Sequence, residues 1–260
     1  VDAKTFQENG CIVGVNNASF EVSKGEMLVV MGLSGSGKST LLRCISRLTD
    51  ATGGKIFIEG QDLLSLNNKE LIDLRRNKMG MVFQSFALLP HKTVVENIAF
   101  PLREHGMNDE NLIQDKVQRV LNLVALDEVI EQMPAELSGG QRKRVALARA
   151  VVLEPRVVLY DEPTTGLDPI RSEVINQLIL KLSQTLGITS IVVTHDLVSA
   201  YRIADHLVLL HEGKVILQGS AEEFQATTDP IAGQFLRGEL GVDELARIRG
   251  KRDDGVQRQL

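Results

Sequence analysis

The chain has 260 residues, a hydrophobic fraction of 43% and a formal net charge of −5, which allows one large domain or two closely integrated ones. A pI near 5.6 and an aromatic content of 4% give neither the charge nor the stacking surface expected of a nucleic-acid-binding protein. No apolar run approaches the roughly 18 residues that suggest a membrane span. The start of the chain has no basic-then-apolar leader, so we expect it to lie in the cytosol.

The first part of the chain alternates between strand patterns and turns. Residues 12–31 alternate apolar and polar side chains around a turn at Lys24 and Gly25, which predicts antiparallel strands. A second strand pattern covers residues 54–60. The apolar run 27–31 then leads into a glycine-rich loop, and a helix-compatible pattern follows it.

The glycine-rich loop has the sequence G-x-x-x-x-G-K-S and ends at Ser39. Its backbone N–H groups can close around phosphates, Lys38 can reach the outer phosphates, and the Ser39 hydroxyl can ligate magnesium. The alternative is a glycine-rich turn with an incidental lysine, but the strand before the loop and the helix after it favour a nucleoside triphosphate site. The expected nucleotide-binding residues are Gly32, Ser34, Gly35, Ser36, Gly37, Lys38, Ser39 and Thr40.

Helical spacing replaces the strand patterns from about residue 93 to residue 137, with Pro101 and Pro134 as punctuation. Strand signals resume at 157–160 and 190–194, separated by a stretch of helix length, as βαβ units with a parallel sheet require. Residues 207–217 predict a terminal hairpin. The pattern as a whole predicts an α/β core with a helical insert.

Two carboxylates, Asp161 and Glu162, end the apolar strand at 157–160. Open α/β folds bind their ligands at this end of the strands. One carboxylate can hold magnesium while the other orients or activates water. The pair could instead cap the following turn, but its combination with the glycine-rich loop favours the functional interpretation.

A helix rich in basic residues opens with the pentapeptide Leu137, Ser138, Gly139, Gly140 and Gln141. The serine could simply cap that helix. With the segment 142–150 that follows, the pentapeptide resembles the signature of the ATP-binding-cassette (ABC) ATPases. The resemblance implies the P-loop NTPase fold of the ABC-ATPase type, with a mixed sheet core, an antiparallel β subdomain and an inserted α-helical subdomain. It also implies a head-to-tail homodimer, in which the signature of one copy contacts the ATP held by Lys38 of the other.

Further residues match the motifs of this family in order. By resemblance, Gln84 touches magnesium and the attacking water and relays the nucleotide state to a membrane partner, and Asp168 communicates across the dimer. His195 follows a strand, where a lone histidine is more often structural, but its place after Glu162 makes it resemble the histidine that contacts the γ-phosphate. Glu162 resembles the carboxylate that orients or deprotonates water. The implied magnesium ligands are Ser39, Gln84 and Asp161.

Both Glu162 and His195 are present, so we expect an active, magnesium-dependent ATPase rather than an ATP sensor. We expect a single ABC ATPase domain over 1–260. Its nucleotide-binding core would comprise 1–91 and 151–240, its helical signature subdomain 92–150, and its C-terminal tail 241–260. An aromatic residue that stacks on adenine is missing from its usual place about twenty positions before the loop, and Phe6 is a weak substitute. GTP use therefore stays open.

The family resemblance divides between two subfamilies. Residues 1–92 resemble the ATPases of glycine betaine and proline importers, through 10–17, 31–44 and 83–91. Residues 93–260 resemble Mla-type phospholipid-trafficking ATPases, through the segments 96–105, 160–170, 203–206 and 229–238. Because the second part is longer, phospholipid is the expected cargo and a quaternary amine is the alternative. A soluble ATPase of DNA repair or translation is a remote alternative.

Either subfamily implies the same surroundings. The partners would be a second ATPase subunit, integral membrane permease subunits and a cargo-capture protein, without nucleic acid. The chain would lie at the cytoplasmic side of the inner membrane as a peripheral subunit.

Overall fold

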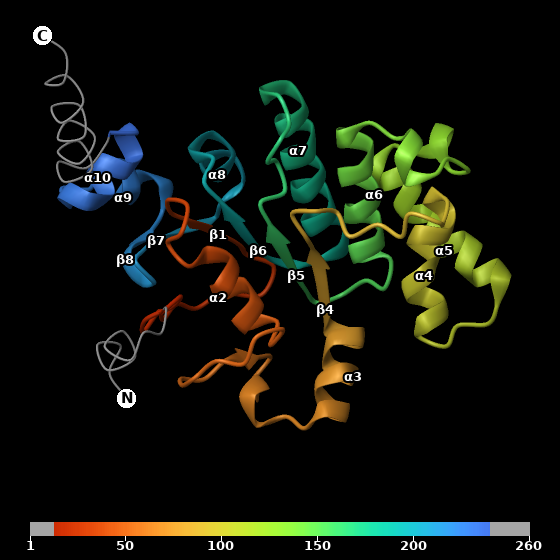
Figure 1. The fold of residues 1–260 in the computed structure, drawn as a ribbon, viewed down its shortest axis with the longest axis horizontal. Coiled ribbons are helices and arrows are strands. Elements are labelled where there is room, and N and C mark those ends of the chain that lie inside the picture. Colours follow the sequence, from red (N-terminus) through yellow and green to blue (C-terminus); the bar gives the residue numbers. More distant parts are fainter. Residues whose placement is uncertain (1–12, 240–260) are drawn as a thin grey trace, which may run out of the picture.

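The computed structural model describes residues 13–239 (Figure 1). The expected tail at 241–260 and Phe6 lie outside the described residues. A six-stranded mixed sheet forms the centre, in the order β4-β5-β6-β1-β7-β8. All neighbours in the sheet run parallel except β7 and β8, which form the antiparallel hairpin expected from the sequence. The strands are β1 (Met27–Met31), β4 (Met79–Val82), β5 (Val157–Asp161), β6 (Thr189–Thr194), β7 (His206–His211) and β8 (Lys214–Gly219).

Helices cover both faces of this sheet, so its central strands are apolar on both sides. In β1, Leu28 and Val30 belong to the apolar cluster that α2 (Lys38–Ile45) completes. Val29 and Met31 point to the opposite face and join the larger cluster. The other helices of the core are α3 (Asn68–Lys78), α7 (Pro169–Leu186), α8 (Leu197–Ile203), α9 (Ala221–Gln225) and α10 (Pro230–Arg237). This arrangement confirms the predicted α/β class.

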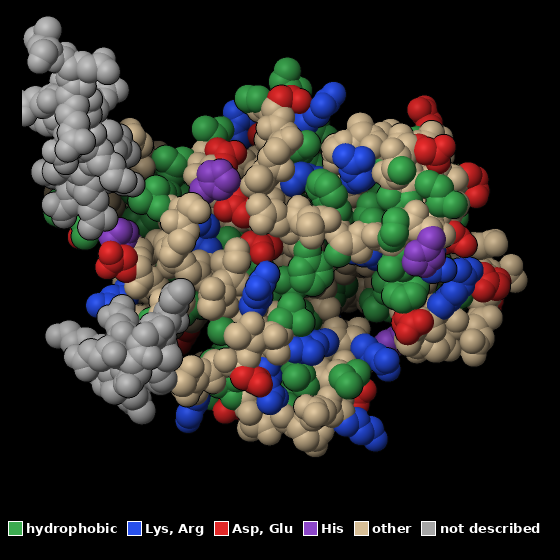
Figure 2. Space-filling model, viewed as in Figure 1, with side chains coloured by type: hydrophobic (Ala, Val, Ile, Leu, Met, Phe, Trp, Pro, Cys, Tyr) green, Lys and Arg blue, Asp and Glu red, His purple; other side chains and the backbone are tan. Residues whose placement is uncertain are grey.

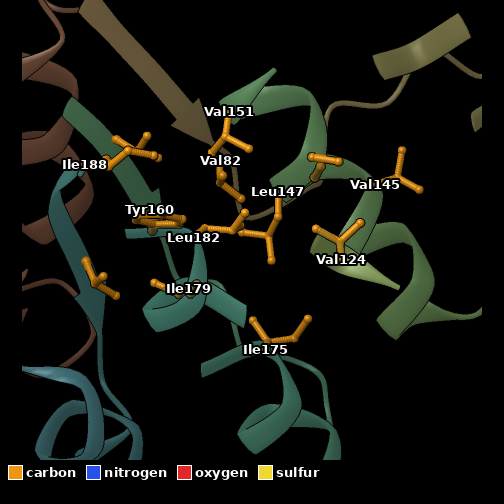
Figure 3. Packing of buried hydrophobic residues seen from close by; sticks show 14 of the residues in the cluster. Val82, Val124, Val145, Leu147, Val151, Tyr160, Ile175, Ile179, Leu182 and Ile188 are labelled. Carbon is orange, nitrogen blue, oxygen red and sulfur yellow. The ribbon is translucent and has the colours of Figure 1, made fainter. Parts of the chain in front are cut away.

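Three helices form the segment between β4 and β5, as the helical spacing predicts. They are α4 (Val94–Glu104), α5 (Glu110–Val124) and α6 (Gly139–Val151). Figure 1 shows α4 and α5 at the end of the molecule opposite α9 and α10. Helix α6 joins the segment to the sheet, because Val145, Leu147 and Val151 lie in one cluster with Tyr160 and Ile179 (Figure 3). The apolar core is thus continuous across residue 150, and the boundaries of the subdomains stay a prediction.

The antiparallel strands expected over 12–31 are absent from residues 13–26, where the prediction is wrong. The apolar side chains of this segment pack against the cluster beneath α2; they are Val15, Ala18, Phe20 and Val22. The alternation of apolar and polar side chains therefore reflects burial on one face and not pairing in a sheet. The segment 54–60 contributes only the short β2 (Phe57–Ile58), which pairs with β3 (Gln61–Asp62). Among the described residues, the antiparallel part outside the main sheet therefore amounts to this pair.

Pro101 does not end its helix, contrary to its expected role as punctuation. It lies inside α4, which continues to Glu104. Proline has no backbone N–H, so Pro101 cannot donate to the Asn97 carbonyl oxygen. Because Pro101 lies in the last turn of α4, the helix loses only this one backbone hydrogen bond. Pro134 does begin a new element, the 3₁₀ turn Pro134–Glu136. None of the helices within 13–239 combines the length and the apolar character that membrane crossing requires.

Strand β4 and helix α6 approach closely at Gly80. A Cβ atom at this residue would lie 2.5 Å from the Ala150 carbonyl oxygen. We expect Gly80→Ala to lower the free energy of unfolding by about 1–3 kcal/mol, because overpacking forces the strand and the helix apart. Urea denaturation measures this change. Gly53→Ala is the matched control, since a Cβ atom there meets nothing within 4 Å; equal loss in both variants would contradict the explanation.

Candidate active site

The predicted site residues lie at one edge of the sheet, although they come from distant parts of the sequence. Met31 pairs with Thr194, and Asp161 pairs with Val193. Val82 at the end of β4 pairs with Tyr160. The segments that begin at 32, 83, 162 and 195 therefore leave neighbouring parallel strands on the same side, where α/β sheets bind ligands.

The glycine-rich loop connects β1 to α2 and depends on a close contact at Gly37. This residue has φ 103°, in the left-handed region that side chains disfavour. A Cβ atom there would lie 1.9 Å from the carbonyl oxygen of Gly14. The loop thus rests directly on the backbone of the preceding segment, which fixes the start of α2.

The Lys38 side chain lies inside this loop. Its side-chain Nζ donates hydrogen bonds to the carbonyl oxygens of Gly32, at 2.7 Å, and Leu33, at 3.0 Å. Burial lowers the pKa of Lys38, and the charges of Glu162 and Asp161 partly oppose this effect. An amine enclosed by backbone at the start of a helix suits the binding of a nucleotide phosphate.

Ser39 and Asp161 form a possible magnesium site. The Ser39 hydroxyl donates to Asp161 Oδ1 at 2.9 Å, and Asp161 is buried. Within 13–239, no group of three or more histidine, cysteine or acidic side chains could hold a metal. Magnesium bound with a nucleotide needs only one or two protein oxygens, since phosphates and water complete its shell. The residues present therefore fit a magnesium–nucleotide complex.

Glu162 lies at a sharp turn directly after β5 and holds two side chains. Its Oε2 accepts from the Thr165 hydroxyl at 3.0 Å and lies 2.9 Å from His195 Nδ1. Glu162 has φ 51°, and its N–H donates to the Val193 carbonyl oxygen at 2.9 Å. Strained backbone of this kind is found preferentially at functional sites. The Glu162 side chain is only 10% exposed, and these two contacts orient its carboxylate.

The other predicted site residues lie on the surface. Gln84 follows β4 and is exposed, with no hydrogen bond to another side chain in the described part of the chain. Asp168 caps α7 by accepting from the Arg171 N–H at 2.9 Å. Ser138 caps α6: its hydroxyl accepts from the Gln141 N–H at 3.3 Å, and the Gln141 side chain accepts from the Ser138 N–H at 2.8 Å.

The signature segment 137–141 is not brought to the loop of its own chain. Within residues 13–239, no hydrogen bond joins this segment to residues 32–40. Ser138 therefore has the capping role that the sequence left open, and its contact with the ATP of a second copy stays a prediction.

Two buried polar side chains were missed by the sequence analysis. Asn97 is fully buried in α4, where it accepts from the Leu89 N–H at 2.8 Å and donates to the Leu89 and Lys92 carbonyl oxygens. It ties α4 to the loop that follows Gln84. Its position on the apolar face of a predicted helix was a usable signal. Lys143 in α6 is 4% exposed, and no pattern in the sequence distinguishes it from the basic residues beside it.

The sequence was compared with models of known protein families. The model of the ABC transporter family matches residues 15–165, which is more than half of the chain. This chain belongs to the ABC transporter family. The cofactors of this family, ATP with Mg²⁺, are those that the site fits.

Individual relatives support the assignment. The trimethylamine N-oxide transport system ATP-binding protein TmoW of Pelagibacter ubique is 62% identical over 215 residues, which are 83% of this chain and 63% of that protein. The intermembrane phospholipid transport system ATP-binding protein MlaF of Haemophilus influenzae is 42% identical over 90% of this chain and 88% of that protein. The chain thus spans less than two thirds of the length of TmoW.

A solved structure supports the fold. The dimeric ATP-binding cassette MJ0796, in a post-hydrolysis state with ADP and phosphate, is 36% identical and has a TM-score of 0.74. The match covers 80% of this chain and 91% of that one. This confirms the expected ABC-ATPase type of fold. The alignment with TmoW spans 215 of the 260 residues, so it must include residue 92 and much of the chain after it. The likeness to an amine transport ATP-binding protein therefore extends beyond the first part of the chain.

The contact between Gly37 and Gly14 gives a test of the loop. We expect Gly37→Ala to weaken ATP binding at least tenfold, because the added Cβ atom would push the loop off the segment beneath it. Isothermal titration calorimetry measures the affinity. Gly25→Ala is the control: Gly25 also has positive φ, at 81°, but it lies outside the loop and a Cβ atom there meets nothing within 4 Å. An equal loss in both variants would show that backbone strain, and not the contact, is responsible.

Proposed function

We propose that this chain hydrolyses ATP to power a transporter whose cargo is a small methylated amine. The contact that supports hydrolysis most directly is the one between Glu162 and His195, 2.9 Å apart at the sheet edge that also carries Lys38. The cargo rests on the comparisons. The ATP-binding role follows from the family and from the loop.

In this proposal the loop 32–40 and Lys38 bind the phosphates, and Ser39, Asp161 and Gln84 hold Mg²⁺. Mg²⁺ held by these residues would neutralise charge on the phosphates. Glu162 orients or deprotonates the attacking water, and its hydrogen bonds to Thr165 and His195 fix its carboxylate. His195 is 57% exposed at its side chain, which leaves it accessible to the γ-phosphate.

We infer a homodimer in which the signature of each copy completes the site of the other. Ser138, Gly140 and Asp168 lie away from their own loop, as shared sites require. Beside Asp168, Ile170 is 79% exposed and Val174 is 46% exposed on the same face of α7. Figure 2 shows hydrophobic side chains at this free end of α7. A second copy that covers this end would bury them.

The helical segment offers a docking groove for the membrane partner. A groove between α4 and α5 has an apolar floor that includes Ala99, Ile113 and Val117. Its rim carries three carboxylates and one arginine: Glu96, Glu110, Glu131 and Arg103. Figure 2 shows acidic side chains on this end of the molecule. We propose that a basic, amphipathic segment of a permease binds there, which places the chain peripherally on the cytoplasmic side of the inner membrane.

Asn97 would transmit nucleotide state to that groove. It lies in α4 between the groove and the loop 84–92, and its side chain bonds the backbone at both Leu89 and Lys92. A shift of the backbone at Leu89 and Lys92 would therefore be passed to α4 through these bonds. The cargo-capture protein expected from the family resemblance stays a prediction.

The comparisons favour a methylated amine over the phospholipid that the sequence analysis expected. Identity to TmoW is 62%, against 42% to MlaF. Trimethylamine N-oxide and glycine betaine share an N-trimethyl group, so this proposal agrees with the alternative that the sequence analysis kept. Phospholipid stays a second candidate, because this chain covers 88% of MlaF but only 63% of TmoW.

The role of Glu162 can be tested by Glu162→Gln. We expect ATP affinity within about twofold of the wild type and a loss of turnover of about 10²–10⁴-fold, as for removal of a general base. Magnesium-dependent phosphate release and equilibrium binding measure the two quantities. Near-normal hydrolysis by the variant would remove Glu162 from its proposed role.

The same variant tests the dimer. ATP that binds but is not hydrolysed should hold two copies together, so light scattering of Glu162→Gln should show a doubled mass with ATP and Mg²⁺ but not with ADP. Adding Ser138→Arg should abolish the doubling, because an arginine would block the shared site. Thermal unfolding of this variant shows whether the monomer stays folded without the Ser138 cap of α6. An unchanged monomer mass with ATP would contradict the shared site.

Cargo is tested by reconstituting the chain with each candidate permease and its capture protein. We expect ATPase stimulation by trimethylamine N-oxide or glycine betaine with a methylated-amine permease. Stimulation only by a phospholipid permease would reverse the choice of cargo and leave the ATPase assignment intact.

A further inference from the structure

Three basic side chains of α6 converge on the loop that follows Gln84. Lys143 Nζ lies 5.2 Å from the centre of the Phe86 ring, and Arg142 Cζ lies 5.7 Å from it. Arg149 donates to the carbonyl oxygens of Phe86, at 3.0 Å, and Ala87, at 2.7 Å. The helix that begins with the signature thus holds this loop through its cations.

The loop needs such support because its backbone is strained. Phe86 has φ 62° and Ala87 has φ 49°, both in the left-handed region. Residues with side chains rarely adopt this region, and two in succession persist only where the surroundings hold them. Here the surroundings are the cations of α6, which bind the ring and both carbonyl groups.

Lys143 also reaches the other side of the site. Its Nζ lies 3.5 Å from the carbonyl oxygen of Glu162, as a long hydrogen bond. Burial lowers the pKa of Lys143 to about 8, and the charge of Glu162 opposes this shift. A cation that is largely removed from water interacts more strongly with an aromatic face than an exposed one does.

We propose that Lys143 is a positioning residue for ATP hydrolysis, which fixes the Gln84 loop and the Glu162 turn to the helix that carries the signature. This proposal rests on the proposed function. Lys143 contacts the Phe86 ring and the Glu162 backbone, whereas the loop 32–40 binds its lysine through its own carbonyl groups. Lys143 should therefore affect turnover and leave nucleotide affinity nearly unchanged.

The test removes either partner of the contact. Lys143→Met keeps the length of the side chain and removes its charge, and Phe86→Leu keeps an apolar side chain and removes the ring. We expect Lys143→Met to lower kcat about 2- to 30-fold, the range that the loss of one cation–π contact gives, with KM for ATP within twofold. Phe86→Leu also removes the contact with Arg142 and should lower kcat at least as much. Phe86→Tyr keeps the ring and should retain wild-type kcat.

A double-mutant cycle separates positioning from general loss of packing. If Lys143 acts through Phe86, the double variant Lys143→Met/Phe86→Leu should lose little more kcat than the more impaired of the two single variants. Arg144→Met is the matched control on the same helix, since Arg144 bonds the Ala125 carbonyl oxygen at 2.9 Å and not the Gln84 loop. It should keep kcat. Thermal unfolding of all variants shows that the comparison is made on folded protein.

Three results would overturn the proposal: unchanged kcat in Lys143→Met, multiplicative losses in the double variant, or an equal loss of kcat in Arg144→Met. Failure of the proposed function gives a different result. In that case the wild-type chain itself hydrolyses no ATP, and all variants are equally inactive.

Discussion

The parallel register of β4, β5, β6 and β1 is the constraint on which the site depends. Each strand ends level with its neighbours, so segments more than a hundred residues apart meet at one edge. A slip of one residue would move a strand by about 3.3 Å. That displacement exceeds the 2.9 Å between the Ser39 hydroxyl and Asp161 Oδ1. It also exceeds the 2.9 Å between Glu162 Oε2 and His195 Nδ1. The apolar contacts on both faces therefore hold the geometry of the site as well as the fold.

Helix α6 adds a second constraint, because it connects the exposed signature to the interior. Leu147 and Val151 lie in one apolar cluster with Val82 and Tyr160 of the sheet, and the absence of a side chain at Gly80 lets β4 lie close to the helix. The same helix holds the loop after Gln84. A site needs supporting side chains that are themselves locked by packing. Helix α6 provides this support for residues that are distant in sequence.

Local sequence predicted most of the site but little of what holds it together. The glycine-rich loop and the acidic pair after β5 are specified by adjacent residues, so they could be read directly. The alternation of apolar and polar side chains over 13–26 led to a wrong prediction of strands, because packing on one face of a sheet and pairing within a sheet give the same pattern. Lys143 could not be predicted, since a basic residue among others on a helix looks solvated until the fold places Phe86 over it.

Capping and nucleotide contact are compatible at the signature. A serine hydroxyl has one donor and two acceptor positions, so Ser138 can accept from the Gln141 N–H and still donate to a phosphate. The first turn of α6 contains no acidic residue, and the glycines at 139 and 140 leave its backbone N–H groups open to an approaching ligand. A helix start of this kind attracts an anion. No hydrogen bond joins the signature to the loop of the same chain among residues 13–239, so we propose that the anion is the phosphate held by the loop of a second copy.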